Sequence, residues 1–140
     1  MEQYIVFFTQ HWELSLLLVV VILAIFIYES WAKVVGPGQI SAGQAVQLIN
    51  HENGVVIDLR DCVIFKQGHI INAVNIPADD LAQKTAILNK YHNRPVILIY
   101  SSGQRLSQIF KFLQQHNFTK ISVLRGGMRA WQEANLPVEK

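Results

Sequence analysis

The chain of 140 residues lacks the residue numbers or spacings on which several classes of site depend. Its single cysteine, Cys62, leaves no partner for an intrachain disulfide, which suits a reducing compartment. Its 12 lysine and arginine residues form no basic run, so the sequence gives no case for a nucleic-acid-binding surface. Its 5 histidines are scattered without the spacing of metal ligands. We therefore expect no metal, no cofactor and no nucleic-acid partner.

Lysine and arginine are also missing from the N-terminal part of the chain, where a long apolar run lies. Residues 14–28 carry no charge, and the wider window 12–31 forms a helix of about 30 Å, which matches the hydrocarbon core of a bilayer. The run is apolar on all sides, and the aromatic residues Trp12, Tyr28 and Trp31 lie near its ends. The sequence predicts one transmembrane helix at about 12–31.

Two other interpretations of this run are a buried core helix and a cleaved signal peptide. Residues 30–32, Ser-Trp-Ala, resemble a cleavage site. A signal peptide, however, has positive charge ahead of its apolar run, whereas the region ahead of this run carries Glu2 and Glu13 and no lysine or arginine. The part from Lys33 onward holds all 12 basic residues against seven acidic ones. Because basic residues favour the cytoplasmic side, we expect the N-terminus outside and the C-terminal domain in the cytoplasm, close to the lipid bilayer.

The rest of the chain is long enough for one folded domain. A Gly-Pro-Gly stretch predicts a linker, placed at 34–38, between an N-terminal segment (1–33) and a domain (39–140). The expected helices are one opened by a capping box at 41–44 and three more at 81–91, 104–116 and 127–134. The expected strands are 55–59, 73–76, 96–99 and 121–124. This alternation predicts an α/β domain with a mainly parallel central sheet flanked by helices.

In such a sheet, binding sites lie at the carboxyl ends of the strands. Two loops leave buried strands there, one at Arg60-Asp61-Cys62 and one that begins at Tyr100. The second loop has the order strand, small residues and helix start, in which backbone N–H groups and a helix N-terminus converge on an anion. The sequence therefore predicts an anion-binding loop made of Tyr100, Ser101, Ser102, Gly103, Gln104 and Arg105.

Several short motifs occur in the order and spacing of the rhodanese-like superfamily, and the domain resembles that family from about Gln39 to Val138. The residues that match its signatures include Asp58, Arg60, Gly68, His69, Gly126, Gly127 and Trp131. The whole chain resembles bacterial proteins with one N-terminal membrane span and one rhodanese-like domain. This resemblance implies a single-pass protein of the bacterial inner membrane.

The resemblance also implies a persulfide relay, in which a loop cysteine takes the sulfane sulfur of an anion such as thiosulfate. In this chain Tyr100 occupies the cysteine position, three residues before Gly103. A phenol oxygen cannot carry sulfur as a persulfide does. We therefore predict a domain without sulfurtransferase activity. It would act as a binding or scaffold module for a membrane or cytoplasmic protein or for a small anion.

Other roles remain open for individual residues. Tyr100 packs over the loop in one interpretation and offers its hydroxyl to an anion in another, while Arg105 either binds an anion or is solvated. We expect Asp58, Arg60 and His69 to be structural and to hold the loops that follow the strand at 55–59 by hydrogen bonds. In the alternative hypothesis, the displaced thiol Cys62 carries sulfur in an active sulfurtransferase. A phosphatase-like use of the loop is less favoured, since the loop is short and lacks a thiolate.

Overall fold

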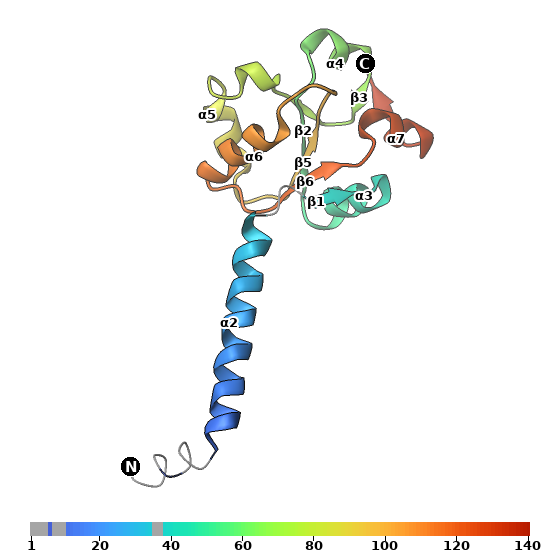
Figure 1. Cartoon of the computed structure of the whole chain (residues 1–140). Coiled ribbons are helices and arrows are strands. Elements are labelled where there is room, and N and C mark those ends of the chain that lie inside the picture. The colour runs from blue at the N-terminus through green and yellow to red at the C-terminus, as the bar shows by residue number, and fades with distance from the viewer. Residues whose placement is uncertain (1–5, 7–10, 35–37) are drawn as a thin grey trace. The chain divides into compact units, whose positions relative to one another are not determined.

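The computed structural model describes residue 6 and residues 11–34 and 38–140 (Figure 1). The chain divides into two units, residues 1–36 and residues 37–140, which are described in turn. Most of the linker expected at 34–38 lies outside the described residues.

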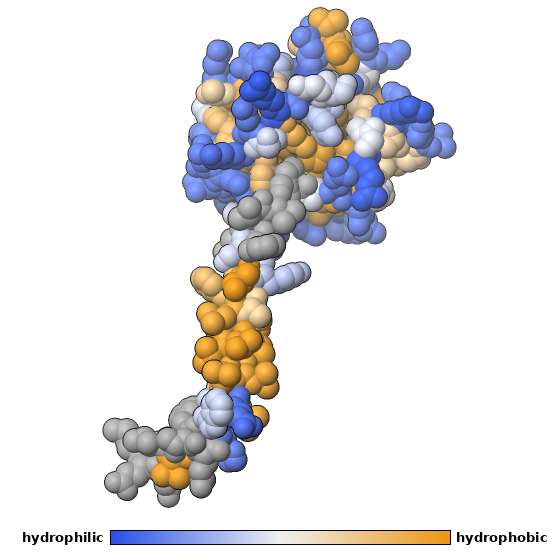
Figure 2. Space-filling view, in the orientation of Figure 1, coloured by the Kyte–Doolittle hydropathy of each residue, from blue (hydrophilic) through white to orange (hydrophobic). Residues whose placement is uncertain are grey.

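The first unit contains helix α2 (Trp12–Val34), whose 23 residues give a length of about 34 Å. Its large apolar side chains between Leu14 and Tyr28 are exposed rather than packed into a protein core, which argues against a buried core helix. The stretch Trp12–Ser30 is long and apolar enough to cross a membrane, and Figure 2 shows its nearly continuous apolar surface. The unit therefore provides one candidate membrane span, as expected.

The second unit is built on a five-stranded sheet in the order β1-β6-β5-β2-β4, in which every neighbouring pair is parallel. Its strands are β1 (Gly38–Ile40), β2 (Val55–Asp58), β4 (Val74–Asn75), β5 (Val96–Ile99) and β6 (Ile121–Leu124). A separate antiparallel pair joins β3 (His69–Ile70) to β7 (Val138–Glu139). The expected α/β domain with a mainly parallel sheet is confirmed.

Helices cover both faces of the sheet (Figure 1). Helix α6 (Leu106–Gln115) and the short α5 (Thr85–Leu88) pack on one face, and α3 (Ala42–His51) and α7 (Gly127–Glu133) pack on the other. The side chains of β5 alternate between these two cores, and all four are fully buried. Because both faces are covered, the central strands need apolar residues at every position, which explains their continuous apolar runs.

The start of α3 follows the sequence prediction closely. The Ser41 backbone N–H donates to Gln44 Oε1 at 2.9 Å, and the Gln44 N–H donates to Ser41 Oγ at 3.3 Å. This reciprocal pair is the capping box expected at 41–44, and it satisfies donors at the helix start that have no partner within the helix.

The prediction of a single helix at 81–91 is wrong. The structure has a 3-10 turn η1 (Ala78–Asp80), then α5, then a second 3-10 turn η2 (Asn89–Tyr91). Only Leu81 and Leu88 are buried in this stretch, so no continuous apolar stripe holds it against the sheet as one helix.

Helix α4 (Cys62–Gln67) and the short strands β1, β3 and β7 were not expected from the sequence. Helix α4 begins where the Asp61 carboxylate accepts a hydrogen bond from the Val63 N–H at 2.9 Å. Cys62 is therefore the first residue of a helix rather than part of an irregular loop. The sequence does not predict the short strands, because two or three residues are too few to show an alternation of apolar and polar side chains.

Candidate functional site

Three loops meet at the carboxyl edge of the sheet, and the loop after β2 is held by a buried ion pair. Asp58 is the last residue of β2 and is fully buried. Arg60 Nε donates to Asp58 Oδ1 at 2.9 Å and Arg60 Nη2 donates to Oδ2 at 2.7 Å, so the guanidinium and the carboxylate form a bidentate pair. Arg60 Nη2 also donates to the Gly68 carbonyl at 2.9 Å, which ties the far end of the loop to the same group.

Asn75 closes this β2 loop from the neighbouring strand. Its Nδ2 donates to the carbonyl oxygens of Asp58 at 3.1 Å and Arg60 at 2.9 Å. His69 is similarly engaged: Nδ1 lies 2.9 Å from the Phe65 carbonyl, and Nε2 lies 3.2 Å from Glu139 Oε1. The polar groups of Asp58, Arg60 and His69 thus bond to other parts of the domain.

Cys62 follows this loop on the surface of the domain. Its side chain is exposed, and the carboxylate of its neighbour Asp61 already caps α4. Among the described residues, no three histidine, cysteine or acidic side chains gather as a metal site would require. Cys62 is therefore an accessible thiol that belongs to no three-ligand cluster in the part of the chain that the structure describes.

The loop after β5 contains the residues that the sequence singled out, and Gln104 organises it. The Ser101 N–H donates to Gln104 Oε1 at 3.0 Å, and the Gln104 N–H donates to the Ser101 carbonyl at 3.2 Å. Gln104 Nε2 donates to the Leu59 carbonyl at 2.7 Å and so joins the β5 loop to the β2 loop. Sequence reasoning placed Gln104 in the loop but missed this connecting role.

A signal for that role was present in the sequence. Residues 101–104 repeat the Ser-x-x-Gln pattern of residues 41–44, which forms the capping box of α3. At 101–104 only the bond from the Ser101 N–H to the glutamine side chain forms, and the amide nitrogen turns to Leu59 instead. Helix α6 consequently begins at Leu106, two residues later than expected.

The rest of the β5 loop is open. Within the described part of the chain, the backbone N–H groups of Ser102, Gly103 and Arg105 donate to no protein acceptor. Gly103 has a φ of 93°, which favours glycine, and a Cβ there would meet no atom within 4 Å. Unpaired N–H groups around an open position are what an anion requires.

Tyr100 and Arg105 bracket these donors. Tyr100 is half-buried and packs against the core under α6, so its ring fills space beside the loop. Arg105 is exposed, and its guanidinium forms no ion pair or hydrogen bond with any residue that the structure describes. The loop therefore offers backbone donors and one uncommitted positive charge, but no thiol.

The loop after β6 completes the edge. Gly126 has a φ of 75° at the start of α7, and a Cβ there would lie 2.8 Å from the Ala130 Cβ, so glycine is required. A Cβ on Gly127 would lie 3.9 Å from the Tyr100 carbonyl oxygen, which places this loop beside the β5 loop. Trp131 is buried, and its Nε1 donates to the Pro137 carbonyl at 3.0 Å, which anchors the segment after α7.

Known proteins are similar to this chain in sequence and in fold. The family model of the rhodanese-like domain matches residues 41–134. The chain is 30% identical to the uncharacterized protein YibN of Escherichia coli K12 over 139 residues, which cover 99% of this chain and 97% of YibN. It is 29% identical to the thiosulfate sulfurtransferase GlpE of Shewanella oneidensis over 96 residues, which cover 69% of this chain and 93% of GlpE.

Solved structures agree with these matches. A rhodanese-related protein from Thermoplasma volcanium, 29% identical, superposes with a TM-score of 0.59 over 73% of this chain and 97% of its own. A thiosulfate sulfurtransferase from Pseudomonas aeruginosa, 19% identical, gives 0.61 over 74% of this chain and 20% of its own and supports the fold alone. By the matched family model and the mainly parallel sheet with its three edge loops, this chain belongs to the rhodanese-like domain family, which includes sulfurtransferases.

Proposed function

We propose that this chain is a membrane-anchored rhodanese-like protein without sulfurtransferase activity, whose domain binds a small anion or a protein partner at the carboxyl edge of its sheet. The observation that carries this function is Tyr100, which occupies the first position of a loop that is otherwise open. The loop keeps its donors and Arg105, whereas the group that would accept sulfur is absent.

The chemistry explains why this one residue matters. In sulfur transfer from thiosulfate, a thiolate attacks the sulfane sulfur, a new S–S bond forms, and sulfite leaves with the electrons of the broken S–S bond. The product is a persulfide, whose negative charge the loop donors stabilise. A tyrosine phenol forms no such S–S bond, so Tyr100 leaves the loop able to bind an anion without reacting with it.

The second candidate function is sulfur transfer through Cys62, favoured by the exposure of its thiol. A thiosulfate:cyanide assay of the full-length chain in detergent, with GlpE as positive control, separates the two functions. We expect a rate equal to that of a protein-free blank and no gain of one sulfur atom on Cys62 by mass spectrometry. Activity that is lost in Cys62→Ser would establish the second function, and activity that survives in that variant would contradict both.

Anion binding is tested separately by titrating the isotope-labelled full-length chain with sulfate and following its amide signals by NMR. We expect saturable shifts at Ser102, Gly103 and Arg105, because their N–H groups are unpaired. The matched pair Arg105→Gln and Lys111→Gln removes one exposed positive charge inside or outside the loop. Equal weakening by the two variants, or no saturable shift in the wild type, would overturn anion binding at the loop.

For the location, we propose the bacterial inner membrane, crossed once by α2, with the N-terminus outside and the domain in the cytoplasm. The length and apolar surface of α2 and the concentration of basic residues after it support this topology. The exposed Cys62, the single cysteine of the chain, provides a probe. A membrane-impermeant maleimide should label it only after spheroplasts are lysed, with Cys62→Ser as the blank. Labelling of intact spheroplasts would reverse the topology.

A further inference from the structure

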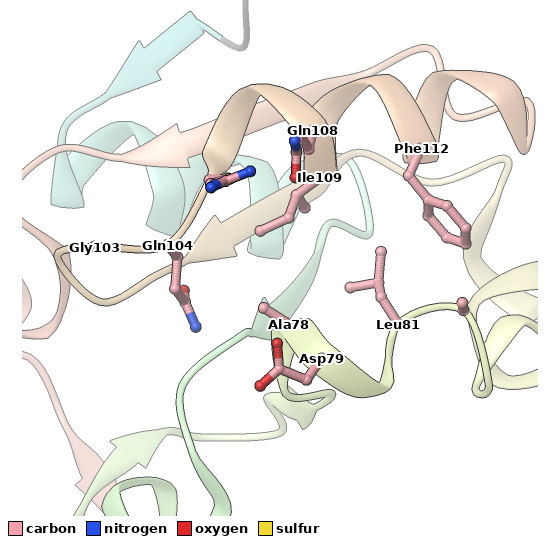
Figure 3. A pocket seen from close by; sticks show the side chains of 10 residues that line it. Ala78, Asp79, Leu81, Gly103, Gln104, Gln108, Ile109 and Phe112 are labelled. Atoms are coloured by element: carbon pink, nitrogen blue, oxygen red, sulfur yellow. The ribbon is translucent and has the colours of Figure 1, made fainter.

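A groove of about 560 Å³ runs along the domain beside the β5 loop (Figure 3). One wall is the face of α6 that carries Gln108, Ile109 and Phe112. The opposite wall is formed by four residues of the segment after β4: Ala78, Asp79, Leu81 and Ala82. Residues 103–105 of the β5 loop complete the lining. The groove thus unites segments about thirty residues apart in the chain with the loop proposed to bind an anion.

The middle of the groove is apolar. In Figure 3, Ile109 and Phe112 point from α6 toward the opposite wall, and Leu81 points back toward them. Leu81 is 4% exposed and Ile109 is 8% exposed, so most of each side chain is held in the core under α6. An apolar surface that is held by the core is already formed before anything binds, which reduces the ordering cost of binding.

Two charges in the lining are uncommitted. Arg105 and Asp79 form no ion pair or side-chain hydrogen bond with the residues that the structure describes. Asp80, the neighbour of Asp79, is instead paired with Lys84 at 3.6 Å and does not line the groove. The groove therefore presents an apolar centre together with one free positive and one free negative group.

We propose that this groove binds an extended segment of a protein partner that places an apolar side chain between Leu81 and Phe112 and pairs charged side chains of opposite sign with Asp79 and Arg105. A small anion would pair with Arg105 but would leave the apolar centre uncovered and Asp79 repelled. An anionic lipid surface would meet the same repulsion. A peptide segment supplies both charges and the apolar group within a few residues, so its charge complements the whole groove.

This proposal rests on the proposed binding function, since the groove shares residues 103–105 with the β5 loop. The probes are two end-blocked tetrapeptides, Lys-Leu-Leu-Glu and Glu-Leu-Leu-Lys, because the direction of the segment is open. The controls are Gln-Leu-Leu-Gln and Lys-Ser-Ser-Glu. Each peptide is titrated into the labelled full-length chain in detergent, and the amide signals of residues 78–82 and 103–112 are followed by NMR.

We expect one of the two charged leucine peptides to bind at least about tenfold more tightly than either control. Ala82→Trp, which places a bulky ring in the groove at an exposed position, and Arg105→Gln should each weaken that binding severalfold. Lys111→Gln should leave it unchanged, since Lys111 is an exposed charge of α6 outside the groove. Asp79→Asn is compared in the same way with Asp80→Asn.

The proposal is overturned if neither charged leucine peptide gives saturable shifts, if the controls bind equally well, or if Lys111→Gln weakens binding as much as Arg105→Gln. The sulfate titration and the sulfur-transfer assay distinguish this failure from failure of the proposed function. Sulfate binding without peptide binding removes the groove and keeps the anion-binding loop, whereas measurable sulfur transfer removes the proposed function whatever the peptides do.

Discussion

The β2 loop and the β5 loop leave adjacent strands of one sheet, yet their arginines have opposite surroundings. Arg60 donates to a fully buried carboxylate and to a backbone carbonyl, and Asn75 binds the same loop from the next strand. Arg105 is exposed, and its guanidinium bonds to no residue that the structure describes. The polar groups of the β2 loop are bonded within the domain, while the β5 loop has backbone N–H groups without a protein acceptor in the described part of the chain.

This difference separates two meanings that a polar residue in a strand-end loop can have. A buried charge whose bonds are all met within the domain holds the fold together, whereas an exposed charge beside unpaired N–H groups is available to a ligand. By this criterion the β2 loop is structural, and the β5 loop, connected to it through Gln104, is the one that we propose to bind a ligand.

The largest expected effect comes from Arg60→Gln. The substitution leaves the carboxylate of Asp58 buried without its positive partner, which costs about 3–5 kcal/mol of folding free energy. Urea unfolding of the full-length chain in detergent, followed by tryptophan fluorescence, measures this cost. Arg129→Gln is the matched control, because Arg129 pairs with Glu133 on the exposed surface of α7 and should barely change the unfolding midpoint. Equal effects of the two variants would show that the buried Arg60 pair stabilises the fold no more than an exposed ion pair does.

A smaller effect is expected where the two loops are joined. Gln104→Ala removes the donor to the buried Leu59 carbonyl and the acceptor for the Ser101 N–H, at a cost of about 1–2 kcal/mol. Amide hydrogen exchange should then quicken in residues 100–105 while the β2 loop keeps its protection. Gln108→Ala, an exposed glutamine of α6, serves as the control. Faster exchange in both loops would show that the β2 loop depends on the β5 loop.

The smallest effect on stability is expected for Arg105→Gln, within about 0.5 kcal/mol, since its side chain makes no bond to the described part of the domain. The same variant should nevertheless lose most of the sulfate binding. Unfolding and NMR titration of one sample measure both quantities. A large loss of stability would mean that Arg105 holds the fold as Arg60 does.

Much of the fold was predictable because its signals are local. The apolar runs at 55–59 and 96–99 predicted buried parallel strands, and the Ser-x-x-Gln pattern at 41–44 predicted a helix start. The sequence predicts one helix at 81–91, but the conformation of this stretch depends on packing. Two buried leucines hold it against the sheet as separate short turns. Such tertiary control cannot be read from helical propensity.

The site was predictable in position but less so in its construction. Topology placed Tyr100 and the residues after it at the carboxyl edge, where the structure has them. The bond from Gln104 to Leu59 spans 45 residues, and the groove joins residues 78–82 to α6. Neither feature leaves a periodic pattern in the sequence, since both depend on strands and loops that meet only after folding.

Tyr100→Cys tests most directly our proposal that the β5 loop keeps an open anion-binding site and lacks only the thiol. The substitution is made in a Cys62→Ser background, beside Tyr100→Ser in the same background, and cooperative urea unfolding confirms that each variant is folded. After incubation with thiosulfate, mass spectrometry should show the gain of one sulfur atom in the Tyr100→Cys variant alone. A folded Tyr100→Cys variant that takes up no sulfur would contradict the account, because the site itself would then be unable to support the chemistry.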